Sequence, residues 1–375
     1  MAVLVDLLHG CWAARNGASL LGESHQRLFL LCGRGCPQGS ASTDSFLTSF
    51  RDAQVLDSGS TAENLYRLKQ AVDRLDLSSV TVLTSRRGRE VLGHYQELLF
   101  TAVYTFDYKV MPVEKLTCPS CAGPAHTGSP GEGIPAEVAA FAQKLPTLRG
   151  EIRVLNTRAG GVTCIPTLSS LNLFKSSKRR DPEAVVTENR RRLALHAGFH
   201  PLPLRLVKVN HASDVWVLGK AEPESYDAMV TDRRGLVLAA PGADCMPILF
   251  ADPVKKVIGA AHADFGCRAE DVVVAVGPAV GPCCFRLDRE QARDFSSIHP
   301  DCVPDPEVAR PHVDIRLANR ILLQNGGVRP EHIHDHTVTD RPCVTPCTSC
   351  HPEDFFSHVR DGINFGTQVG FLWMD

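Results

Sequence analysis

Three short apolar runs, each leading to a histidine or a cysteine, constrain the fold of this chain more than any other feature. Residues 204–209 precede His211, residues 236–240 precede Cys245, and residues 257–261 precede His262. Runs of this length and composition are typical of strands, and strand ends that meet at one edge of a sheet bring together side chains distant in sequence. The pattern therefore predicts a sheet edge that gathers two imidazoles and one thiol.

Two imidazoles and one thiolate are a suitable ligand set for zinc. Three protein ligands leave the fourth tetrahedral position open, and this property distinguishes a catalytic zinc site from a closed structural one. The zinc ion lowers the pKa of a water molecule that binds at this open position. A histidine after a strand can also cap a turn, however, and a buried cysteine can pack as a small apolar group. The spacing alone leaves both interpretations open.

Length and composition indicate two domains and narrow the functional classes. With 375 residues, 43% of them hydrophobic, the chain can bury two modest cores. The net charge of −2 gives no electrostatic footprint for nucleic acid or an anionic membrane. No stretch reaches the roughly 18 apolar residues of a membrane span, and residues 1–15 lack the basic start of a signal peptide. We therefore expect a cytoplasmic protein whose 14 cysteines are mainly reduced.

The first domain is expected at residues 1–116, as a small α/β unit without an evident site. Apolar residues recur every three or four positions in 61–75, which predicts an amphipathic helix. Strands are expected at 3–8, 27–31, 80–83 and 98–106. Residues 117–150 are expected to form a linker rich in Pro, Gly and Cys, with a connecting helix at 135–145.

The second domain is expected at residues 151–375 and opens on a strand at 152–155. Arg158 and a pair of glycines follow this strand, and a guanidinium beside accessible backbone N–H groups suits phosphate. A tight turn with a solvated arginine would explain the same residues. A helix is expected at 181–196, because Asp-Pro is a typical helix start.

Two carboxylates near the predicted edge are candidate proton carriers. Asp227 lies in an expected strand at 226–231, and Asp244 directly precedes Cys245. A positioned carboxylate can move a proton during catalysis. A buried aspartate can equally well do no more than hold a turn, so both roles stay open at this point.

The remaining cysteine motifs are less specific. The Cys-x-x-Cys pairs Cys118/Cys121 and Cys347/Cys350 lie in separate regions, so a structural zinc shared between them is not expected. The adjacent Cys283 and Cys284 would point to opposite faces of a strand, which favours packing over a shared metal.

The alternating histidines His332, His334 and His336 form a second candidate metal motif. Histidines on one face of a strand can bind copper, but a multicopper oxidase requires several such motifs and this chain has one. We therefore expect exposed, flexible histidines here rather than a copper centre.

An ordered set of segments resembles the polyphenol-oxidase-like laccase-domain family. The segments are NTRAGGV at 156–162, VNH at 209–211, GADCMPIL at 242–249, GAAHA at 259–263, GPAVGPCCF at 277–285 and FFSHVRDG at 355–362. The resemblance covers about residues 151–375. It implies an α/β (α+β) fold, a layered α/β/β/α sandwich with mixed sheets, to which the smaller amino-terminal α/β domain is added.

The same resemblance implies a purine nucleoside enzyme with one zinc ion per chain. The implied reactions are phosphorolysis of adenosine, inosine, guanosine or methylthioadenosine to the free base and ribose 1-phosphate, and deamination of adenosine to inosine. His211, Cys245 and His262 would hold the zinc and Arg158 the phosphate co-substrate, with Asp244 and Asp227 as proton carriers.

Purine nucleosides and phosphate are thus the expected partners, and nucleic acid and a membrane span are not. Protein partners, a homo-oligomer, and an association with the nucleus or peroxisomes are compatible with the resemblance.

The chain departs from the family pattern directly after His262. The family continues with a Gly-Trp turn and a helix, whereas here an expected strand at 271–276 follows almost at once, as though a segment of roughly twenty residues were deleted. A parallel crossover needs about 12 residues or more and usually contains a helix. Either the strands pair differently or the edge of the site is open.

Two alternative functions come from other classes. In the first, Cys245 is a thiolate nucleophile with a histidine base, as in a hydrolase or deamidase. In the second, the shortened chain is catalytically impaired and acts by association with other proteins.

Overall fold

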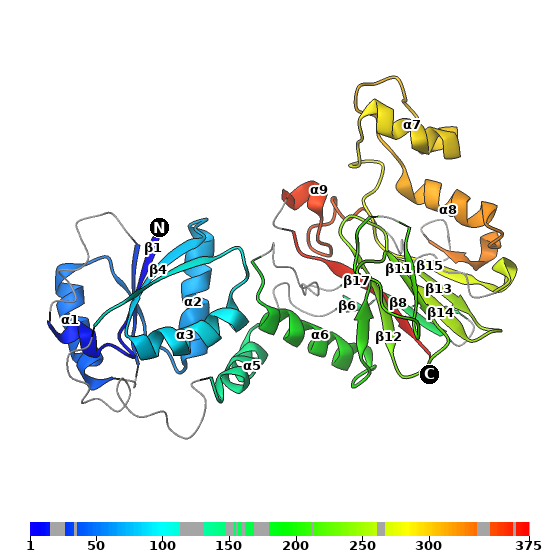
Figure 1. Cartoon of the computed structure of the whole chain (residues 1–375). Coiled ribbons are helices and arrows are strands. Elements are labelled where there is room, and N and C mark those ends of the chain that lie inside the picture. The colour runs from blue at the N-terminus through cyan, green and yellow to red at the C-terminus, as the bar shows by residue number, and fades with distance from the viewer. Residues whose placement is uncertain are drawn as a thin grey trace. The chain divides into compact units, whose positions relative to one another are not determined.

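A computed structural model of the chain describes residues 1–15, 27–33, 36–112, 131–146, 153–154, 157–159, 162–168, 180–211, 213–260, 267–335, 346–362 and 365–374, with the backbone alone at 14–15, 37–40 and 153–168. The chain divides into two compact units (Figure 1). The first unit comprises Met1–Leu145 and Lys175–Glu188, and the second comprises Pro146–Phe174 and Asn189–Asp375. The expected linker at 117–130 lies outside the described residues.

The first unit is built on a five-stranded parallel sheet, which we call sheet I, with the strand order β3-β2-β1-β4-β5. Its strands are β1 (Ala2–Asp6), β2 (Arg27–Leu31), β3 (Gln54–Leu56), β4 (Ser79–Thr84) and β5 (Thr105–Val110). The helices of this unit are α1 (Pro37–Ser49), α2 (Thr61–Arg74), α3 (Arg86–Leu99) and α5 (Ile134–Lys144).

Helices cover both faces of sheet I, as a parallel sheet requires. Leu68 of α2, Leu99 of α3 and Val138 of α5 are buried in one core with Leu4 of β1. Phe46 of α1 is buried in a second core on the other face, against Val5 of the same strand. The amphipathic pattern of 61–75 is confirmed as α2, which begins where the Ser60 side chain accepts a hydrogen bond from the Glu63 N–H.

The expected strand at 98–106 is wrong. The apolar run there joins two elements, since Leu99 closes the buried face of α3 and the strand β5 begins only at Thr105. A short apolar run does not by itself distinguish the end of a helix from a strand. Helix α1 has no sequence signal either, because Ser, Thr and Gly dominate it and tertiary packing of Phe46 stabilises it.

The second unit contains two six-stranded sheets. Sheet II has the order β6-β8-β17-β12-β9, with β7 paired to β8, and sheet III has the order β10-β11-β14-β13-β15-β16. The strands of sheet II are β6 (Arg153–Val154), β7 (Thr157–Ala159), β8 (Val162–Leu168), β9 (Leu204–Leu206), β12 (Val237–Gly242) and β17 (Gln368–Trp373). Those of sheet III are β10 (Val215–Val217), β11 (Ala228–Thr231), β13 (Ile248–Asp252), β14 (Val257–Ala260), β15 (Val273–Val276) and β16 (Ile333–His334).

The two sheets pack face to face and helices cover their outer faces. Leu238 and Leu372 of sheet II share a core with Met229 and Leu249 of sheet III. The second half of α6 (Glu183–Ala197), through Leu193, packs on the other face of sheet II.

Helix α8 (Ile315–Asn325) packs on the other face of sheet III, and α7 (Arg289–Ile298) packs on α8. The short helix α9 (His358–Asp361) precedes β17. Both sheets contain parallel and antiparallel pairs, so the α/β/β/α sandwich with mixed sheets is confirmed. Within the described residues, no helix is long and apolar enough to cross a membrane.

Candidate functional site

The strands that precede the predicted ligands do not share the one sheet that the sequence predicted, because β9 and β12 belong to sheet II and β14 belongs to sheet III. Strand β14 ends at Ala260, which pairs with Met229 of β11 on one side and with Leu249 of β13 on the other. Met229 comes two residues after Asp227, and Leu249 comes four residues after Cys245. The chain therefore leaves β14 toward His262 between the start of β11 and the start of β13. His262 itself lies outside the described residues.

The turn that carries His211 is held by Asp227. The two carboxylate oxygens of Asp227 accept hydrogen bonds from the backbone N–H groups of Asn210, at 3.3 Å, and His211, at 3.0 Å. The Asn210 side chain donates a further hydrogen bond to the Ser225 hydroxyl. His211 is exposed and has a φ of 61°, in the left-handed region that is uncommon for residues other than glycine. The carboxylate thus stabilises a strained backbone at a candidate ligand.

The turn that carries Cys245 is packed so closely that its first residue has to be glycine. A Cβ on Gly242 would lie 2.7 Å from the Cys245 carbonyl oxygen and 2.8 Å from the Pro247 ring. Pro247 in turn fills the space above Gly277, where a Cβ would lie 2.6 Å from its ring. Ala243, next in the turn, has a φ of 144°. Cys245 is exposed as a residue and lies in a closely packed turn, although protein atoms surround its sulfur.

Asp244 connects this turn to the carboxy-terminal segment. One carboxylate oxygen accepts a hydrogen bond from the Thr348 hydroxyl at 2.6 Å, and the other accepts one from the Val359 N–H at 2.7 Å. The backbone carbonyl of Asp244 accepts a hydrogen bond from the Val280 N–H. The carboxylate is buried, so it has the contacts of a residue that positions its neighbours.

The surroundings of Cys245 favour the protonated form of its thiol. Burial of the sulfur among protein atoms and the carboxylates of Asp244 and Asp227 raise its pKa above the ordinary value. A catalytic cysteine needs the opposite shift, from an adjacent cation or a helix N-terminus.

The structure describes only the backbone of Arg158, the residue predicted to bind phosphate. Arg158 lies in β7 and pairs with Thr163 of β8, in sheet II. Its side chain lies outside the described residues.

The structure contradicts the packing role expected for Cys283 and Cys284. They lie in a turn, not in a strand, so both side chains reach the same neighbourhood. Together with Cys347 and Cys350 they form a cluster whose sulfur atoms all lie within 4.8 Å of one another and could hold a metal ion. We call these residues the four-cysteine cluster. No local motif links Cys283 and Cys284 to the Cys347/Cys350 pair, and the other Cys-x-x-Cys pair, Cys118/Cys121, lies outside the described residues.

The alternating histidines are not simply exposed. His334 belongs to β16 and pairs with Ala275 of β15, and both His332 and His334 are half-buried. The expectation of exposed, flexible histidines is therefore wrong for His332 and His334, whereas His336 lies outside the described residues.

An apolar hollow on sheet III lies beside the described part of the connection between β14 and β15. Strands β14 and β15 do not pair with each other, because each pairs antiparallel with β13 from opposite sides. Strands β14 and β15 are therefore parallel to each other, and within the described part of the connection between them only a short 3-10 turn forms, at Ala269–Asp271. A normal crossover carries a helix that covers the sheet.

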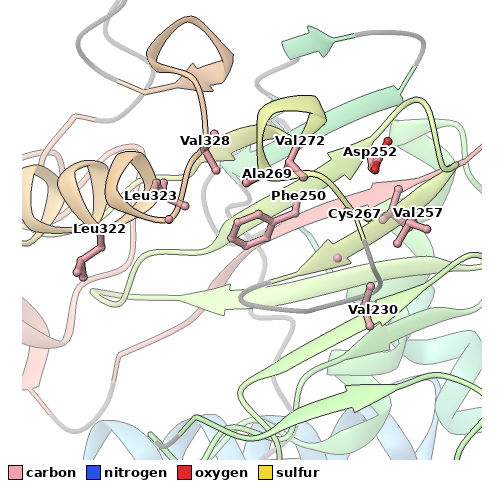
Figure 2. A pocket seen from close by; sticks show the side chains of 13 residues that line it. Val230, Phe250, Asp252, Val257, Cys267, Ala269, Val272, Leu322, Leu323 and Val328 are labelled. Carbon is pink, nitrogen blue, oxygen red and sulfur yellow. The ribbon is translucent and has the colours of Figure 1, made fainter.

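The hollow beside this connection has a volume of about 250 Å³. Figure 2 shows Phe250 and Val230 of sheet III on one side and Leu322 and Leu323 of α8 on another. Cys267 also lines it, so the hollow borders the shortened connection. Leu322 is 44% exposed, which a covering helix would reduce.

Comparison with known proteins identifies the family. The family described as "Multi-copper polyphenol oxidoreductase laccase" matches residues 153–264 and 263–375, more than half of the chain. The chain belongs to this laccase family. The match breaks into two pieces at 263–264, at the position where the family pattern is interrupted after His262.

Several proteins similar to this chain carry the names of nucleoside enzymes. "Purine nucleoside phosphorylase LACC1" of Mus musculus is 44% identical over 83% of this chain and 80% of its own length, and the Homo sapiens protein of the same name is 43% identical over 85% and 81%. "Adenosine deaminase RL5" from an unknown prokaryotic organism is 26% identical over 48% of this chain and 79% of its own length.

Proposed function

We propose that this chain is a zinc-dependent purine nucleoside enzyme whose main reaction is phosphorolysis. Inorganic phosphate attacks the anomeric carbon of the ribose, the bond between that carbon and the purine nitrogen breaks, and the products are ribose 1-phosphate and the free base. Adenosine, inosine, guanosine and methylthioadenosine are the substrates we propose. Relatives named purine nucleoside phosphorylase, at 43–44% identity, support the reaction class.

The observation that supports a metal site most directly is the pairing of Ala260. It lies between Met229 and Leu249, next to the turns that present His211 and Cys245. Two imidazoles and a thiolate fit zinc, and Asp227 holds the His211 turn through its backbone N–H. We therefore propose His211, Cys245 and His262 as the ligands.

Bound zinc would supply Lewis acidity and a lowered pKa for coordinated water. The chain's own residues would transfer protons, position the ligands and bind phosphate. Asp227 orients His211 and is the carboxylate that we propose as the proton carrier, because it is only half-buried and adjoins the ligand turn. Asp244, whose oxygens both accept hydrogen bonds from the carboxy-terminal segment, positions Cys245. Arg158 would bind phosphate through its guanidinium.

Deamination of adenosine is a second proposed reaction of the same site. Water adds to the purine carbon that bears the amino group, and ammonia leaves while a carboxylate transfers the protons. Its support is the relative named adenosine deaminase. The proposed thiolate-nucleophile alternative is disfavoured by the raised pKa of Cys245.

The deciding experiment incubates purified protein with adenosine, with and without phosphate, and follows adenine, inosine and hypoxanthine while bound zinc is measured. We expect base release that requires phosphate. His211→Ala should lower it about 100-fold or more, because the ligand set loses an imidazole and several kcal/mol of catalytic stabilisation with it. His196→Ala is the matched control, since His196 is an exposed histidine of α6. The assay is repeated with inosine, guanosine and methylthioadenosine. A folded wild-type protein that forms no product from any of the four nucleosides would favour the impaired, interaction-only alternative.

A further inference from the structure

The four-cysteine cluster has the spacing of a closed metal site. The Cys350 sulfur lies 3.3 Å from that of Cys284 and 3.6 Å from that of Cys283, and all four sulfurs lie within 4.8 Å of one another. Four thiolates at about 2.3 Å from a tetrahedral zinc lie about 3.8 Å from each other. Small adjustments of these side chains would therefore place all four around one ion.

The backbone around the cluster supports the sulfur atoms. The N–H of Gly281 donates a hydrogen bond to the Cys347 sulfur at 3.2 Å, and Cys347 to Cys350 form a tight turn closed by the Cys350 N–H and the Cys347 carbonyl, at 3.2 Å. A backbone N–H directed at sulfur favours the thiolate, which is the form that binds metal.

A buried cation beside the cluster has no carboxylate partner among the described ion pairs. Arg316 is only 8% exposed, and its guanidinium donates a hydrogen bond to the Ala279 carbonyl while its Nε atom has no partner. One guanidinium nitrogen and the Cys283 sulfur each lie 3.3 Å from the point where a Cβ on Gly281 would be, so they are at most twice that distance apart. A zinc ion with four thiolates carries two net negative charges, and such a group would explain a buried guanidinium at this place.

A second arginine contacts the turn directly. Arg360 donates hydrogen bonds to the carbonyls of Thr348 and Ser349, within the Cys347–Cys350 turn, and also to Phe355. Its contacts hold the turn, and its charge is paired with the carboxylate of Asp361.

We propose that Cys283, Cys284, Cys347 and Cys350 bind a structural zinc ion, distinct from the zinc proposed at His211, Cys245 and His262. All four positions are occupied by protein sulfur, so the ion has no open position for substrate. Binding releases the protons of those cysteines that are still thiols.

The zinc ion would fasten two segments that are distant in sequence. One contains Cys283 and Cys284 and the other contains Cys347 and Cys350. Thr348 lies inside the second turn and donates its hydroxyl hydrogen bond to Asp244, the residue before Cys245. The structural ion therefore also fixes the turn that presents Cys245.

The test measures zinc and its ligands in the full-length chain after reduction. In the double variant His211→Ala/Cys245→Ser, we expect about one zinc per chain to remain, and X-ray absorption at the zinc edge should show a shell of sulfur alone at about 2.3 Å. Adding Cys350→Ser to this variant should remove that zinc, whereas adding Cys11→Ser, a cysteine of the first unit, should not.

A readout without any cluster substitution keeps the proposal testable if the serine variant does not fold. Cobalt added to the zinc-free double variant should give thiolate-to-metal charge-transfer absorption at one equivalent, and should protect these four cysteines from alkylation. A folded double variant that binds no zinc or cobalt, with the four thiols freely alkylated or with a Cys284–Cys350 disulfide, would overturn the proposal. The double variant lacks two ligands of the proposed catalytic zinc, so its zinc content reports on the four-cysteine cluster alone. Failure of the proposed enzymatic function would be seen instead in the nucleoside assay of the wild-type protein.

Discussion

Asp244 shows how one side chain can connect a candidate ligand to a distant segment. Its carboxylate is buried and accepts hydrogen bonds from Thr348 and Val359, so its charge is matched by donors from two places in the carboxy-terminal segment. A hydrogen bond to a charged acceptor contributes about 1.5–3 kcal/mol. The Cys245 turn therefore depends on residues more than a hundred positions away.

Replacement of Thr348 should test this connection. Thr348→Val keeps the shape of the fully buried side chain but removes the hydroxyl, and we expect the free energy of unfolding to fall by about 2 kcal/mol, because Asp244 loses a donor. Thr348→Ser, which keeps the hydroxyl, should lose less. Chemical denaturation of the two variants provides the comparison, and equal losses would assign the effect to packing of the methyl group.

Among the secondary-structure elements, α2 is tied to its neighbours by Asp73. The carboxylate accepts hydrogen bonds from Lys69 of the same helix, from Tyr104 just before β5, and from Arg180 just before α6. Burial alone would raise the pKa of Asp73, but the hydrogen bonds from Lys69, Tyr104 and Arg180 lower it below its ordinary value. These contacts hold the start of α6 within the first unit.

Two tyrosines give a matched prediction for this network. Tyr104→Phe removes a donor to a carboxylate and should cost about 2 kcal/mol, whereas Tyr108→Phe removes a donor to the neutral Gln96 and should cost about 1 kcal/mol. Thermal and denaturant unfolding at neutral pH would measure both.

The pH dependence follows from the lowered pKa of Asp73. Because its pKa is lower in the folded chain than in the unfolded chain, the stabilisation is fully present above the unfolded value and is lost as the pH falls through the folded value. The cost of Tyr104→Phe should therefore shrink below about pH 4. A cost independent of pH would contradict the role given to the carboxylate.

At the scale of the whole molecule, each unit has its own hydrophobic core. The cores on the two faces of sheet I are formed by residues of the first unit. Sheets II and III share a separate core in the second unit. Helix α6 begins in the first unit and ends in the second. Units with separate cores are expected to unfold in separate steps.

Core substitutions should separate these steps. Leu68→Ala, in α2, and Leu249→Ala, in β13, each leave a cavity and should destabilise their own unit by about 2–5 kcal/mol. Calorimetry should show a different transition moving to lower temperature in each variant. One common transition, shifted equally by both substitutions, would show that the two units unfold together.

The sequence by itself determined the features that depend on local periodicity or on ordered motifs. Helix 61–75 follows from its apolar spacing, and the family and the layered fold follow from motifs such as GADCMPIL. The strands before His211, Cys245 and His262 are likewise visible as short apolar runs and were found as β9, β12 and β14. The metal ligands and Arg158 stay predictions.

Only the tertiary structure decided which distant residues meet. Cys283 and Cys284 have no local signal that links them to Cys347 and Cys350, because a turn in place of the expected strand and the docking of a distant segment bring the sulfurs together. The role of Asp244 depended on Thr348 and Val359 in the same way. Local pattern reflects the period of a helix or strand, whereas long-range contacts depend on how whole elements pack, and a single sequence does not display that packing.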